Sequence, residues 1–105
     1  MDFNDYQDKV LQYRTKTADE MYAVIGLSGE VGELHSFIAK AIRDGVKDEA
    51  EFETNIKKEL GDILWFIAAI ADDFETSLDE IAQGNYYKLK DRMERGVIGG
   101  SGDLR

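Results

Sequence analysis

The chain has no cysteine, no proline and a single histidine among its 105 residues. Without cysteine it can form neither disulfides nor zinc–thiolate sites. The absence of proline removes a common cause of broken helices, and the rest of the composition is rich in helix-forming residues. We therefore expect an all-α protein.

Basic residues are also scarce: 13 lysines and arginines face 22 acidic residues, for a net charge of −9. Such a balance disfavours duplex DNA and anionic membrane surfaces, since both bind basic patches. No apolar run has the length of a signal peptide or a membrane span. We expect a cytoplasmic protein with no DNA or membrane partner.

Four helix starts are indicated by a capping residue followed three positions later by a glutamate or glutamine. These pairs are Asn4 with Gln7, Thr17 with Glu20, Asp48 with Glu51, and Ser77 with Glu80. They predict helices over about 4–16, 18–44, 49–74 and 78–95, the second ending at Gly45 and the fourth at Gly96. Short connections favour an antiparallel four-helix bundle, and so small a core favours oligomerisation.

The predicted helical domain covers residues 1–95, and the glycine-rich segment 96–105 follows it. This segment carries little apolar content, which is typical of a flexible tail or a strap between subunits. A lid that closes on a ligand and brings Arg105 with it is the other interpretation.

Two acid pairs are the most informative feature of the chain: Glu30 with Glu33, and Glu59 with Asp62. Glu30 and Glu59 each occupy a position within an apolar stripe of their helix. The stripes are Ala23, Leu27, Glu30, Leu34, Phe37, Ala41 and Phe52, Ile56, Glu59, Ile63, Phe66, Ile70. A carboxylate that faces a core is costly unless a cation or hydrogen-bond donors compensate it, so a bound divalent cation is predicted.

Both pairs have the same context of Glu, aliphatic, Gly, acid, aliphatic, with Gly32 and Gly61 expected to let backbones or a ligand come close. Oxygen ligands without cysteine favour Mg²⁺, with Mn²⁺ as the alternative. A di-iron site would need Glu-x-x-His pairs, and His35 is out of phase with the acids. Surface acids without a ligand remain the simpler alternative.

The run over residues 26–34, followed by residues 59–65, resembles the MazG-like all-α nucleoside triphosphate pyrophosphohydrolases, whose signature is Glu-x-x-Glu, a spacer and Glu-x-x-Asp. The resemblance implies Mg²⁺-dependent hydrolysis of nucleoside or deoxynucleoside triphosphates to monophosphate and pyrophosphate. It also implies that Glu30, Glu33, Glu59 and Asp62 are the metal ligands and catalytic residues, in a homo-oligomer that is a dimer or a tetramer. Glu33 or Glu59 would accept the proton of the attacking water.

The fourth helix carries Asn85, Lys88 and Arg92 on one face, and we expect them to bind the substrate phosphates. Trp65 is a further candidate for substrate binding, although aromatic residues at helical spacing more often belong to a core. His35 is expected at the surface.

Three other functions stay open. The acidic site could sense a nucleotide or a metal without turnover, or the chain could be an acidic interaction bundle with no site. A related enzyme acting on phosphoribosyl-linked nucleotides is the third. Base and sugar preference are not specified by any of these residues.

Overall fold

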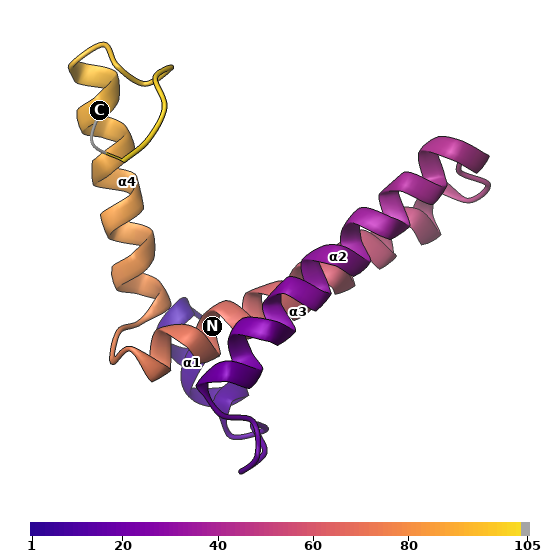
Figure 1. The fold of residues 1–105 in the computed structure, drawn as a ribbon, viewed down its shortest axis with the longest axis horizontal. Coiled ribbons are helices and arrows are strands. Elements are labelled where there is room, and N and C mark those ends of the chain that lie inside the picture. The colour runs from indigo at the N-terminus through magenta and orange to yellow at the C-terminus, as the bar shows by residue number, and fades with distance from the viewer. Residues whose placement is uncertain (104–105) are drawn as a thin grey trace.

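In the computed structural model, which describes residues 1–103, the chain forms four helices (Figure 1). They are α1 (Phe3–Leu11), α2 (Glu20–Asp44), α3 (Glu49–Asp73) and α4 (Leu78–Glu94). The predicted all-α class is confirmed. Leu104 and Arg105, which belong to the predicted tail or lid, lie outside the described residues.

The two later helices begin where the sequence predicts and end one residue earlier, and the glycines predicted to follow α2 and α4 do so. Asp48 caps α3 and Ser77 caps α4, and each side chain accepts the backbone N–H three residues on. Gly45 follows α2 with φ 83°, and Gly96 lies just beyond α4 with φ 73°, conformations that favour glycine.

The caps predicted for the first two helices, Asn4 and Thr17, were wrong, because the caps are Asp2 and Asp19. Each carboxylate accepts a backbone N–H of the first turn, where the helix dipole favours a negative charge. The first helix is also shorter than predicted, since it ends at Leu11 and gives way to turns.

The helices do not form one parallel stack. Figure 1 shows α2 and α3 side by side as a long antiparallel hairpin. Helix α1 packs against the C-terminal end of α3, far from the turn that joins α2 to α3. The expected antiparallel packing therefore holds for α2 and α3. By contrast, α4 projects away from the hairpin and, within residues 1–103, contacts α1 and the end of α3 but not α2.

A small core joins α2 to α3 where Ala23 and Ala69 pack around Phe66. At this point the two helices come so close that a Cβ added at Gly26 would lie 2.2 Å from the Phe66 ring. By contrast, no such contact exists within the described chain at Gly32 and Gly61, whose added Cβ atoms would meet nothing within 4 Å. The close backbone approach is thus one helical turn or more from where it was expected.

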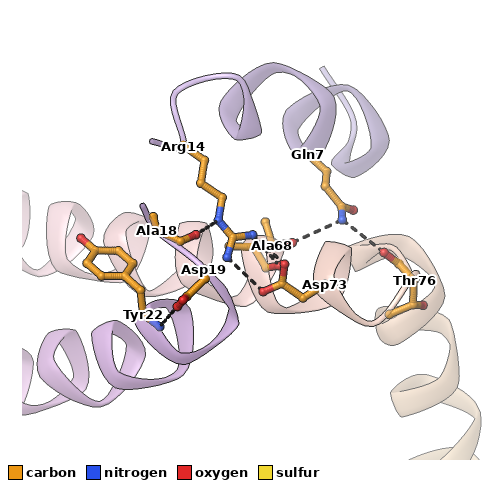
Figure 2. A network of polar contacts seen from close by, with 9 residues as sticks. Gln7, Arg14, Ala18, Asp19, Tyr22, Ala68, Asp73 and Thr76 are labelled. Atoms are coloured by element: carbon orange, nitrogen blue, oxygen red, sulfur yellow. Dashed lines mark hydrogen bonds and ion pairs between the residues drawn. The ribbon is translucent and has the colours of Figure 1, made fainter. Parts of the chain in front are cut away.

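The buried side chain of Gln7 connects three elements. Its Nε2 donates to the carbonyls of Ala68 at 3.4 Å and Thr76 at 3.3 Å, and its Oε1 accepts the N–H of Leu78 at 2.9 Å (Figure 2 shows the two carbonyl contacts). Since Leu78 begins α4, this one amide ties α1 to the end of α3 and the start of α4.

Arg14 fastens the segment after α1 to the end of α3. Its guanidinium donates to both carboxylate oxygens of Asp73, and its Nε donates to the Ala18 carbonyl at 2.6 Å (Figure 2). No local sequence pattern predicts this pairing, because Asp73 is 59 residues away.

None of the helices within residues 1–103 is both long and apolar enough to cross a lipid bilayer.

Candidate metal centre

The antiparallel hairpin brings three of the predicted ligands together. One carboxylate oxygen from each of Glu30, Glu33 and Glu59 lies within 4.8 Å of the other two. Residues three apart share one side of a helix, so Glu30 and Glu33 both face α3 or its edge, where Glu59 lies. Three carboxylates so close repel one another unless a cation or protons neutralise them.

Two of these side chains each bury an oxygen that has no hydrogen-bond partner in the described residues: Oε2 of Glu30 and Oε2 of Glu59. A buried acceptor left unpaired costs about 1–3 kcal/mol, and more when it is charged. The pKa of Glu30 is raised to about 7, mainly because burial disfavours its charged form, and further by the negative charges of Glu33, Asp62 and Glu59. A divalent cation with oxygen ligands fits this cluster, because it would satisfy both oxygens and offset the repulsion.

Asp62, the fourth predicted ligand, is exposed and does not belong to the close cluster of three. Its charge nevertheless acts on the site, since it contributes to the raised pKa of Glu30. It also reaches Tyr6 of α1, whose pKa is raised first by burial and then by Asp62.

Beside the carboxylates lies an open cavity of about 550 Å³. It is lined by Gly29, Gly32, Glu33, Ser36, Phe37, Lys40 and Glu59. A second cavity of about 310 Å³ lies at the turn between α2 and α3, and Phe37 and Lys40 line both. Sequence reasoning overlooked Lys40, although it follows Glu33 by seven residues and so falls on the same side of α2.

The residues predicted to bind phosphates are not near the carboxylates of the same chain. Asn85, Lys88 and Arg92 lie on α4, which does not contact α2 (Figure 1). The last two instead hold Asp103, which accepts from Lys88 Nζ at 3.1 Å and from Arg92 Nη2 at 3.0 Å. Their role in substrate binding stays a prediction.

Trp65 is held by packing within the fold. Its indole Nε1 donates to the Val10 carbonyl at 3.1 Å, and its ring meets Phe66 edge to face at a centroid distance of 5.0 Å. These contacts anchor α1 on α3, and its assignment to substrate binding also stays a prediction. His35 is exposed, as expected.

Two comparisons with known proteins cover most of the chain. The model of the MazG nucleotide pyrophosphohydrolase domain matches residues 18–97, a range that includes both acid pairs. The chain is also similar to the Gene 37 protein of Mycobacterium phage L5, with 41% identity over 86 residues that make up 80% of this chain and 75% of that protein. No solved structure matches.

Proposed function

The chain belongs to the MazG nucleotide pyrophosphohydrolase family, and from this premise we propose that it hydrolyses nucleoside or deoxynucleoside triphosphates to the monophosphate and pyrophosphate. The observation that carries the proposal is the pair of buried, unpartnered oxygens on Glu30 and Glu59 beside the carboxylate of Glu33. Burying these oxygens without a partner is unfavourable, and a bound cation would provide the missing partner.

Glu30, Glu33, Glu59 and Asp62 would hold Mg²⁺ or Mn²⁺. When bound, the cation neutralises phosphate charge and makes a nearby water more acidic. Glu30 and Glu59 supply the buried oxygens, while Glu33 and Asp62 are exposed toward an arriving nucleotide. The carboxylates alone would repel a polyphosphate, so this protein's turnover depends on the metal.

The reaction is the attack of water on the α-phosphorus. A bond forms from the water oxygen to that phosphorus, the bond to the oxygen bridging the α- and β-phosphates breaks, and pyrophosphate leaves with the electron pair. The proton of the water passes to a carboxylate, for which Glu33 and Glu59 are both placed at the edge of the open cavity.

We further propose that the working form is a homo-oligomer, a dimer or a tetramer. The radius of gyration is 16.8 Å, well above the roughly 13 Å of a compact domain of this length. Large apolar side chains lie exposed on α2 and α4, among them Met21, Ile25, Ile42, Tyr87 and Met93. In such an assembly α4 of one copy could bring the exposed Lys88 to the carboxylates of another, whereas the buried Arg92 would reach them only after leaving Asp103. We place this assembly in the cytoplasm, where nucleotides are drawn from a common pool.

Pyrophosphate release from a panel of ribo- and deoxyribonucleoside triphosphates tests the proposal. Release with Mg²⁺ or Mn²⁺, but not with EDTA and not from the Glu59→Gln variant, is the expected result. A folded Glu59→Gln variant with wild-type turnover would refute the assigned site. If nucleotide and Mg²⁺ raise the melting temperature without any release of pyrophosphate, the chain is a sensing module instead.

A further inference from the structure

The cavity at the turn between α2 and α3 is built differently from the carboxylate centre. The rings of Phe37 and Phe52 stack there at a centroid distance of 5.3 Å and an interplanar angle of 19°. Both rings are only half-buried, and they line a cavity of about 310 Å³, within the usual size range of small-molecule sites.

This cavity adjoins the hollow beside the proposed metal ligands, because Phe37 and Lys40 line both. Ser36, one turn of α2 after Glu33, lines the hollow beside those ligands. A ligand that reaches from Glu59 to the stacked rings would lie along Ser36, Phe37 and Lys40. We call the two adjoining hollows the hairpin groove.

Resting on the proposed function, we propose that the hairpin groove binds the nucleoside part of the substrate, with the base against Phe37 and Phe52 and the phosphates at the carboxylates. An aromatic surface suits a flat neutral base, since bases stack on such rings with little dependence on sequence. The Asn55 side chain lines the same cavity and makes no hydrogen bond in the described part of the chain, so its amide is available to the edge of a base.

The charges of the cavity argue against the opposite orientation, with the terminal phosphates at the turn. Three acids line it, Asp44, Asp48 and Glu51, against the two lysines Lys40 and Lys47. Because Arg43 pairs with Asp44, the positive and negative charges are balanced there, and the lining has no excess of positive charge to hold a polyphosphate. Lys40, at the junction of the two hollows, is placed to meet the phosphate nearest the sugar.

Two variants test the groove, each with a matched control. Phe52→Leu removes half of the aromatic stack, and Phe74→Leu makes the same change at an exposed ring at the other end of α3. Ser36→Leu fills the groove from an exposed position on α2, and Ser28→Leu makes the same change at an exposed serine that does not line it. Because Ser36 is exposed on a helix, its replacement by leucine leaves folding intact even if Phe52→Leu unfolds the hairpin.

We expect Phe52→Leu to raise the KM for nucleoside triphosphates about tenfold, the effect of losing one stacking contact. Ser36→Leu should also raise this KM, because its side chain obstructs the groove, while both controls should stay within about twofold. Phe52→Leu should also change the ranking of the four bases. Mn²⁺ binding, measured with the metal alone, should match the wild type in all four variants, which separates the groove from the metal centre.

Unchanged KM and base ranking in both groove variants would overturn the inference. So would a change in oligomeric state of Ser36→Leu, measured by sedimentation, with KM unaltered, because the groove would then be a contact between copies. If the wild type hydrolyses no nucleotide, the proposed function fails on its own. Binding of nucleoside monophosphates with Mn²⁺, compared by calorimetry across the same variants, would then decide the groove by the same criteria.

Discussion

Arg14 and Asp73 form a two-point ion pair, with Nη1 to Oδ1 at 2.8 Å and Nη2 to Oδ2 at 3.0 Å, and each side chain keeps only 14% of its exposure. Removing one partner would leave the other charge poorly solvated, so Arg14→Met should lower the free energy of unfolding by about 2–3 kcal/mol. Urea denaturation measures the change.

Arg43→Met is the matched control, because Arg43 pairs with Asp44 in the same way but at exposures of 70% and 59%. An exposed pair contributes little to stability, so this variant should remain close to the wild type. An equal loss of unfolding free energy in the two variants would mean that the Arg14 pair stabilises the fold no more than an exposed pair does.

The contact between Gly26 and Phe66 makes a second prediction. A methyl group at residue 26 would overlap the ring, since its position lies 2.2–2.9 Å from three ring carbons. We expect Gly26→Ala to cost about 1–3 kcal/mol of stability despite the better helix propensity of alanine.

Gly84→Ala on α4 provides the comparison, because its added methyl would meet nothing within 4 Å. That variant should gain up to about 1 kcal/mol from helix propensity alone. If thermal melting shows both variants stabilised, α2 does not rest on Phe66 as the structure describes.

Burial and the neighbouring acids make the metal-free protein sensitive to pH through Glu30, whose pKa is raised to about 7. A carboxyl group with a raised pKa binds its proton more tightly in the folded state. Its contribution to stability is complete below the unfolded value near 4.5 and is lost as the pH rises through about 7. In EDTA, the melting temperature of the wild type should therefore fall between pH 5 and pH 8.

Glu30→Gln removes this titration while keeping the shape of the side chain. At pH 8 the metal-free variant should be more stable than the wild type, by on the order of 1 kcal/mol, and the difference should shrink toward pH 5. A gap that does not change with pH would show that the carboxylate of Glu30 is not desolvated.

Local signals in the sequence predicted the four helices, the starts of the last two, and three of the acids that lie together. Each depends on spacing within one helix: Asp48 and Ser77 cap their own first turns, and the acids recur at three-residue steps. The pairing of Arg14 with Asp73 joins residues far apart in the chain, and no local pattern encodes it.

The direction of α4 likewise depends on contacts between residues that are far apart in the chain. A short connection at Thr76 suggested that α4 would turn back along α3. Its direction is instead set by contacts that the connection does not reveal, chiefly the amide of Gln7 bonded to Thr76 and Leu78. The separation of Lys88 and Arg92 from the carboxylates follows from that direction (Figure 1).

The last prediction concerns the segment after α4, which Asp103 fastens to the helix. Arg92 first, and then Lys88, lower the pKa of Asp103 by donating hydrogen bonds to its carboxylate. The contact is thus present above the ordinary pKa of an aspartate and is lost as the pH falls through the lowered value. Asp103→Asn should abolish the charge and release the segment over residues 97–103 at neutral pH.

Hydrogen exchange reports this release directly. Amides of residues 97–103 should exchange faster in Asp103→Asn than in the wild type. High salt should also speed exchange in the wild type, because the Asp103 side chain is exposed to solvent and its ion pairs are therefore screened. Asp79→Asn, a change of the same kind at the start of α4, should leave these amides unaffected. Identical exchange in Asp103→Asn and the wild type would mean that backbone contacts such as Val97 N–H to the Arg92 carbonyl hold the segment without the carboxylate.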